Sequence, residues 1–343
     1  MPVWSEQEKM IADSAAAFFA GRGAIARVRR HRDSGTDFDA ATWQDAAAQG
    51  WLGMLVPEAS GGLGLGLRDA LALMREAART VPPEPFADMI ALAGGLADIS
   101  SAQDLLARMM SGNSVIVPVR LDVFVASDNL TGLSAPAAGV GSAQGYVLLC
   151  SGGNDSHRLM LAEKNTPGVT VHASATHDGG NIGRVELKNA SAKCLASGEE
   201  AAHLIRDIED TRLLLHAAEL VGLADEARQR ALTYLETRKQ FGVALSSFQS
   251  LQHRVASLHV QIAAADALLV EAARAFGGDR QSFAAQAAFH RAGTAARLAT
   301  KEAIQLHGAI GFTDELEIGF FLKRAMALTA AEGGLEAITL MQA

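Results

Sequence analysis

The feature that most constrains the fold is a long apolar stripe with helical spacing in the last third of the chain. Apolar residues recur there at alternating steps of four and three, at Leu251, Val255, Leu258, Ile262, Ala265, Leu269, Ala272 and Phe276. This spacing predicts one buried face of an α-helix. The Gly277-Gly278 pair that follows supplies the positive-φ freedom that helix ends use. Alanine-richer patterns over 211–237 and 284–306 extend the prediction to a bundle of four or five closely packed helices.

The middle of the chain has a different pattern. It contains short runs of β-prone residues, separated by Gly, Asn, Asp and Pro. These runs are Val115-Ile116-Val117, Val123-Phe124-Val125, Tyr146-Val147-Leu148-Leu149, Leu159-Met160-Leu161 and Val169-Thr170-Val171. Before them the chain has amphipathic helical patterns. We therefore predict an α+β fold with an N-terminal helical domain (1–112), a small central β-sheet or barrel domain (113–197) and a C-terminal four-helix bundle (198–343).

Composition narrows the class of protein. The chain has 343 residues, 49% of them hydrophobic, which is enough for a large buried core. Its two cysteines, Cys150 and Cys194, lack a CxxC partner, so we expect neither a disulfide framework nor a metal site. The net charge of −8 opposes nucleic-acid binding. The first ten residues contain the charged Glu6 and Glu8. Elsewhere, charged residues interrupt the long apolar runs. We therefore expect no signal peptide, no membrane span and a cytoplasmic location.

A short glycine turn joins two of the predicted helices, at Arg238-Lys239-Gln240-Phe241-Gly242, with Phe248-Gln249 after it. Taken alone, a helix that ends at an arginine and turns at a glycine explains this pattern. The segment also resembles the RxxFG…Q signature of the acyl-CoA dehydrogenase family. The resemblance implies that Arg238 meets the FAD pyrophosphate, and that Gln240, Phe241 and Gln249 contact the adenosine half of the cofactor across a subunit interface. A guanidinium fork matches paired phosphate oxygens, which fits that role.

A second glycine turn lies later in the bundle, at Gln305-Leu306-His307-Gly308-Ala309-Ile310-Gly311-Phe312. It resembles the QxxGGxGF turn of the same family, with Ala309 in place of the second glycine. The resemblance implies that Gln305 and Gly308 approach the FAD diphosphate. Near the N-terminus, Trp51-Leu52-Gly53-Met54-Leu55-Val56-Pro57-Glu58 and the glycines that follow it are also typical of the family. We interpret those glycines as a packed loop, because no strand precedes them and no Walker lysine follows.

Glu332 is the candidate catalytic base. It lies 27 residues after Gln305, where common members of the family carry their base, and Gly333 follows it as expected. A family minority places the base upstream of the first turn, but that place holds Arg212 or Thr211. A carboxylate at Glu332 would remove the α-proton of an acyl-CoA thioester while a hydride leaves the β-carbon for the flavin. The alternative is an exposed loop glutamate without a catalytic role.

The β region departs from the family pattern. Full-length relatives cradle the flavin ring with a Thr-Glu-Pro-x-Ala-Gly-Ser-Asp segment and a Trp-Ile-Thr strand, and this chain has neither. The chain therefore also resembles shortened family members that occur as one of two unlike subunits. Further along, Lys323-Arg324 could meet the CoA phosphates, and we interpret the pair instead as a helix cap.

Three functions are compatible with these residues. The first is an FAD-dependent acyl-CoA dehydrogenase subunit that desaturates an acyl-CoA and passes electrons to an electron-transfer flavoprotein. It would act as a homo-oligomer, or as a hetero-oligomer with a full-length relative. The second is a non-catalytic structural subunit that supports a full-length partner dehydrogenase. The third is a flavin enzyme of related fold, such as a monooxygenase or a nitroalkane oxidase.

Overall fold

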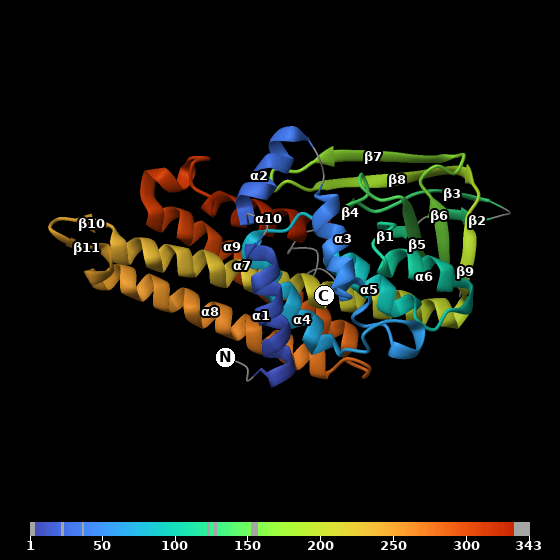
Figure 1. Cartoon of the computed structure of the whole chain (residues 1–343), viewed down its shortest axis with the longest axis horizontal. Coiled ribbons are helices and arrows are strands. Elements are labelled where there is room, and N and C mark those ends of the chain that lie inside the picture. The colour runs from blue at the N-terminus through green and yellow to red at the C-terminus, as the bar shows by residue number, and fades with distance from the viewer. Residues whose placement is uncertain are drawn as a thin grey trace, which may run out of the picture. The chain divides into compact units, whose positions relative to one another are not determined.

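The computed structural model describes residues 4–21, 24–35, 38–121, 124–126, 129–151 and 157–332. Helices come first along the chain, then strands, then helices again (Figure 1). This order confirms the predicted α+β class.

The chain divides into two compact units, each built from separate stretches of sequence. The first unit comprises Met1–Val28, Leu71–Pro82 and Leu213–Ala343, and the second comprises Arg29–Ala70 and Pro83–Arg212. Helix gives way to strand between Met110 and Ile116, and strand to helix between Ser197 and Gly198. The division into three consecutive domains stays a prediction.

The N-terminal part is helical, as predicted. Its helices are α1 (Glu6–Ala20), α2 (Ala24–Ser34), α3 (Ala40–Ala48), α4 (Leu67–Ala77), α5 (Phe86–Leu96) and α6 (Gln103–Met110). Ser5 starts α1 with a capping box: its Oγ accepts a hydrogen bond from the Glu8 amide at 3.1 Å, and its own amide donates to the Glu8 carboxylate at 2.8 Å. In the second unit, the rings of Trp43 and Phe86 stack with centroids 5.3 Å apart, so α3 and α5 share one apolar core.

The glycine-rich loop after Trp51 is a packed structural element, which confirms its interpretation. A Cβ added at Gly62 would lie 2.2 Å from the carbonyl oxygen of Val56. One added at Gly53 would lie 2.6 Å from the sulfur of Met110. No side chain fits at Gly62, where the obstacle is backbone, and at Gly53 the Met110 side chain would have to move, so close packing within the second unit explains these glycines.

The central strands form two small sheets. The first has the order β1 (Ile116–Leu121), β5 (Gly145–Cys150), β6 (Arg158–Glu163) and β9 (Lys193–Ser197). The pair β1 and β5 is parallel, and the other pairs are antiparallel. The second sheet contains β2 (Phe124–Ala126), β3 (Leu130–Leu133), β8 (Asn181–Ala190) and β4 (Ala137–Ala138), with β7 (Val169–Ala175) also paired to β8.

The five predicted β-prone runs overlap β1, β2, β5, β6 and β7; Val115 lies just before β1, and Val123 lies outside the described residues. The strands of these two sheets that the sequence pattern did not reveal are β3, β4, β8 and β9. The longest of these, β8, buries Val185 and Leu187 but carries Arg184, Glu186 and Lys188 between and beside them. It therefore contains no contiguous apolar run, although charged and apolar residues alternate along it.

Four long helices follow the sheets: α7 (Gly198–Thr237), α8 (Gln249–Arg274), α9 (Gln281–His307) and α10 (Ile318–Ala331). The predicted stripe of α8 is confirmed, because Leu258, Ile262 and Leu269 are buried. Gly277, just beyond α8, has a φ of 82°. Within the first unit, α7 and α4 approach so closely that a Cβ added at Gly222 would lie 2.2 Å from the carbonyl oxygen of Arg75.

Helix α8 is long and apolar enough to cross a membrane by length and composition alone, with a mean hydropathy of 1.4 in its most apolar window. Core helices pass the same test. In this structure α8 carries Asp266, whose carboxylate forms a buried ion pair with Arg75 at 2.7 Å. The expected absence of a membrane span stays a prediction.

Candidate functional site

The first glycine turn is a two-residue β-hairpin at the end of α7. Strand β10 (Lys239–Gln240) pairs antiparallel with β11 (Val243–Ala244), so Phe241 and Gly242 form the loop. Their φ angles are 53° and 84°. Two positive φ angles are what a type I′ hairpin turn requires. Glycine adopts this region freely, whereas Phe241 does so under strain, as residues at ligand-binding turns often do.

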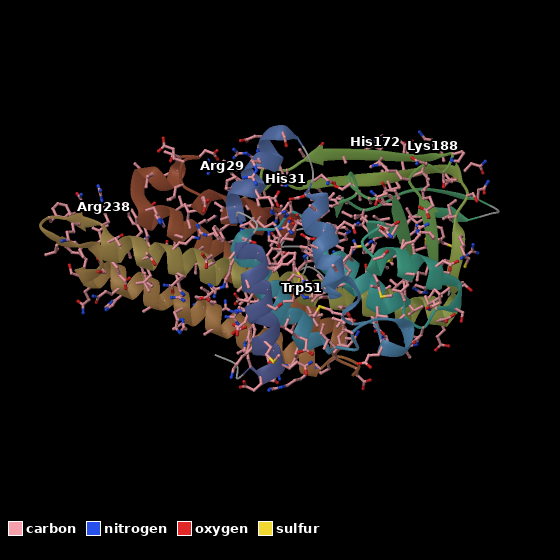
Figure 2. The ribbon with its side chains drawn as sticks, viewed as in Figure 1. Arg29, His31, Trp51, His172, Lys188 and Arg238 are labelled. Atoms are coloured by element: carbon pink, nitrogen blue, oxygen red, sulfur yellow. The ribbon has the colours of Figure 1, made fainter. Side chains whose placement is uncertain are left out.

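The side chains of this hairpin and its flanks are exposed. Arg238, Gln240 and Gln249 are all in contact with solvent, and Phe241 is 89% exposed. Figure 2 shows Arg238 at the hairpin end of the bundle. Within the described part of the chain, the Arg238 guanidinium makes no hydrogen bond or ion pair. All its donors therefore remain available to a ligand or partner.

The second glycine turn is the short helix η6 (Gly308–Phe312), which follows α9. Gly308 has φ 69° and ψ −146°, a backbone conformation that essentially only glycine adopts. A Cβ added there would meet no heavy atom within 4 Å. In contrast, a Cβ added at Gly311 would lie 2.4 Å from the carbonyl oxygen of Ile304. Gly311 therefore serves packing against α9, while Gly308 leaves its backbone open beside the exposed Gln305.

His307 joins the two turns. Its ring lies 4.6 Å from that of Tyr234 near the end of α7, and its Nδ1 lies 2.6 Å from the carbonyl oxygen of Ala303. Burial lowers the pKa of His307, the hydrogen bond to Ala303 opposes that shift, and the charge of Arg230 adds to it. His307 is thus a neutral, hydrogen-bonded structural residue that holds the Arg238 turn and the Gly308 turn at the same end of the bundle.

Glu332 lies apart from these two turns. It follows α10, which starts soon after η6 and extends for 14 residues, or about 21 Å. Glu332 is half-buried at the end of that helix. The structure therefore brings Arg238, Gln240, Phe241, Gln249, Gln305 and Gly308 to one end of the bundle, and places Glu332 away from it. Gly333 and Gly334 lie outside the described residues.

Arg324 and Glu219 form a buried ion pair that the sequence pattern did not reveal. Arg324 does not cap a helix: it lies within α10, and its Nε donates to the Glu219 carboxylate of α7 at 2.6 Å. Glu219 is fully buried. Burial alone would raise the pKa of Glu219, but Arg324 and His216 hold that pKa below its usual value. A single carboxylate within the apolar run 213–223 was a signal that a buried cationic partner exists.

The residues at the hairpin end fit a dinucleotide cofactor. The free guanidinium of Arg238 suits a diphosphate, since a planar fork of donors matches phosphate oxygens. The open backbone at Gly308 permits close approach of a ligand. Within the described residues, no group of three or more His, Cys, Asp or Glu side chains could hold a metal ion.

Two family models match the chain, and together they cover both helical parts. The acyl-CoA dehydrogenase N-terminal domain matches residues 5–100, and the acyl-CoA dehydrogenase C-terminal domain matches residues 204–342. The second match includes both glycine turns and Glu332.

Among curated proteins, the chain is 27% identical to acyl-CoA dehydrogenase IpdE2 of Mycobacterium tuberculosis over 93% of its length and 91% of that protein. It is 29% identical to acyl-CoA dehydrogenase FadE34 of the same organism over 92% of its length, and spans 44% of that protein.

Solved structures of similar fold include acyl-CoA dehydrogenases. A Tcur3481-Tcur3483 steroid ACAD variant matches with a TM-score of 0.88 and 25% identity, over 98% of this chain and 96% of that one. The ChsE4-ChsE5 complex of M. tuberculosis matches with a TM-score of 0.87 and 20% identity, over 99% and 97% of the two chains. A glutaryl-CoA dehydrogenase of M. smegmatis in complex with FADH2 matches with a TM-score of 0.82 and 17% identity, over 98% and 93%. The chain belongs to the acyl-CoA dehydrogenase family, FAD-binding oxidoreductases that act on CH–CH groups.

Proposed function

We propose that this chain is a subunit of an FAD-dependent acyl-CoA dehydrogenase that forms the α,β double bond of an acyl-CoA thioester. The observation that carries the proposal is the meeting of the Arg238 turn and the Gly308 turn at one end of the bundle, joined by the contact between Tyr234 and His307. These turns are far apart in the sequence, and each pattern taken alone can be explained as an ordinary turn at a helix end. Their shared location and their exposed surfaces support a common ligand.

Six residues at that end of the bundle contact the cofactor. Arg238 pairs with the FAD pyrophosphate, Gln240, Phe241 and Gln249 contact the adenosine half, and Gln305 and Gly308 approach the diphosphate. Exposure of the hairpin supports contact with a cofactor held by another subunit, so the protein acts as an oligomer. When bound, FAD supplies the acceptor for the hydride of the substrate β-carbon. The electrons then pass to an electron-transfer flavoprotein.

Glu332 takes the α-proton of the acyl-CoA in this proposal. A half-buried carboxylate at a helix end is reachable by a substrate and partly shielded from water.

A Glu332→Gln variant tests the base directly, because it keeps the size and polarity of the side chain and removes the carboxylate. The protein, with any subunit that copurifies, is loaded with FAD and mixed without oxygen with butyryl-, octanoyl- or palmitoyl-CoA. Flavin absorbance should bleach in the natural protein, and the rate should fall by about a hundredfold or more in Glu332→Gln. A Glu315→Gln variant, changed at an exposed carboxylate of the same unit, should bleach normally. Equal rates in all three proteins would rule out Glu332 as the base.

A second candidate function is a non-catalytic subunit of a heteromeric dehydrogenase. The lack of the flavin-cradle segments in the β region favours it. Under this alternative the two turns bind the adenosine half of an FAD whose flavin ring lies in a full-length partner. The Glu332→Gln change would then leave bleaching in the reconstituted complex unaffected, while the chain alone would take up no flavin.

A further inference from the structure

A charged cluster lies inside the apolar bundle of the first unit. Glu219 of α7 is fully buried, and its Oε1 accepts a hydrogen bond from the Nε of Arg324 at 2.6 Å. The side chains of this pair are 1% and 8% exposed. The Nδ1 of His216, one turn earlier on α7, lies 3.7 Å from the other carboxylate oxygen. The proposed chemistry uses none of these three residues.

A buried ion pair of this kind is weak evidence for net stability. Removing two charges from water is costly, and well-packed apolar residues of similar size are often equally stable or more so. Breaking the pair is unfavourable, because a shifted helix would leave either charge buried without its partner. The pair therefore disfavours shifted registers of α10 on α7.

A second contact shows the direction in which α10 lies along α7. Glu317, next to the start of α10, pairs with Arg230 at 2.9 Å, and the guanidinium of Arg230 also lies 5.1 Å from the ring centroid of Phe321. Arg324 lies seven residues after Glu317 along the chain and pairs with Glu219. Glu219 lies eleven residues before Arg230 on α7. The two helices are therefore antiparallel, and two ion pairs hold them.

The helix held in this way leads directly to Glu332. Glu332 follows Arg324 by eight residues, or about 12 Å of helix. A slip of α10 by a single residue would move its end by about 1.5 Å and turn it by about 100°. Such a displacement is large compared with the tolerance of a proton transfer, for which a misplacement of about 1 Å can cost a hundredfold in rate.

We propose that the Glu219–Arg324 ion pair fixes the register of α10 on α7 and thereby positions Glu332 for proton abstraction. This inference rests on the proposed function. Glu219 and Arg324 are positioning residues, because they act through Glu332 and contact no substrate.

The test replaces both charges together, in Glu219→Leu/Arg324→Met, so that neither partner is left alone and the bundle can fold. The matched control is Arg75→Met/Asp266→Leu, which removes another buried ion pair of this unit, between α4 and α8. With the FAD-loaded protein and octanoyl-CoA, kcat should fall by about tenfold to a hundredfold in the double variant while KM changes little. The control should keep the natural kcat.

A second readout follows the register of α10 without using activity. Spin labels on Leu298→Cys of α9 and Met326→Cys of α10, both exposed positions, report the distance between the two helices. The labels are placed in a Cys194→Ser background, since Cys194 is exposed and Cys150 is buried. A single narrow distance should broaden or split in Glu219→Leu/Arg324→Met and stay narrow in the Arg75/Asp266 control.

The outcomes separate this inference from the proposed function. An unchanged distance in the double variant would overturn the register lock. A broadened distance with an unchanged kcat, in a protein that Glu332→Gln inactivates, would overturn the positioning role. Full activity of Glu332→Gln would remove the base assignment itself, and the distance measurement would still decide whether the ion pair holds α10.

Discussion

At the scale of single residues, Arg238 differs from the arginines deeper in the bundle. Arg75, Arg230 and Arg324 all form ion pairs with carboxylates, whereas Arg238 forms none within the described chain. An unpaired guanidinium beside this hairpin is free to bind an anion without first breaking an internal contact.

Replacing Arg238 should therefore weaken flavin binding. A charge-assisted hydrogen bond contributes about 1.5–3 kcal/mol, so Arg238→Met should raise the Kd for FAD by about tenfold to a hundredfold. Flavin fluorescence quenching during titration measures this Kd. An Arg280→Met variant, changed at the start of α9 where Arg280 lies over the ring of Phe283, should bind FAD normally. Equal affinity in both variants would exclude Arg238 from the cofactor site.

His307 predicts a pH dependence of stability. Its pKa is lowered in the folded protein, so between that value and the unfolded value near 6.5 the unfolded chain binds more protons. The contribution of His307 to the free energy of unfolding is complete above about pH 6.5 and is lost as the pH falls toward the folded pKa. Urea unfolding at about pH 7.5 and about pH 5.5 should show a larger loss for the natural protein than for His307→Gln. Identical losses would contradict a buried, neutral His307.

At the scale of secondary-structure elements, the strength of the periodic signal decided what the sequence could predict. Helix α8 was predictable because its apolar residues recur over seven turns and Gly277 ends the pattern. Strand β8 was missed because its buried Val185 and Leu187 alternate with charged residues and form no contiguous apolar run of the kind that marked the predicted strands. Strand β8 pairs with β3, β4 and β7, and a local sequence pattern does not contain these pairings.

Close helix packing can be tested with two glycines that lie in helices of the same unit. Gly222→Ala of α7 would place a Cβ 2.2 Å from the carbonyl oxygen of Arg75, so this change should destabilise the protein by about 1–3 kcal/mol. Gly319→Ala of α10 meets open space, so it should be neutral or raise stability by up to about 1 kcal/mol. Chemical denaturation measures both values. A stabilising Gly222→Ala would contradict the close approach of α4 and α7.

At the scale of the whole molecule, the chain assembles each compact unit from distant stretches of sequence. Arg75 pairs with Asp266, which lies 191 residues away, and Arg324 pairs with Glu219 at a separation of 105. The motifs at Arg238 and Gly308 were recognisable from their own residues, but their meeting at one end of the bundle depends on the contact between Tyr234 and His307. Long-range pairings of this kind decide the site, and no local pattern encodes them.

The proposed function requires that the two glycine turns of the bundle bind FAD. A structure of the protein, purified with any companion subunit and saturated with FAD, would show this binding. We expect density for the cofactor diphosphate beside Arg238 or Gly308, with the adenosine half near Phe241 and Gln249. Bound FAD that contacts neither turn would contradict it.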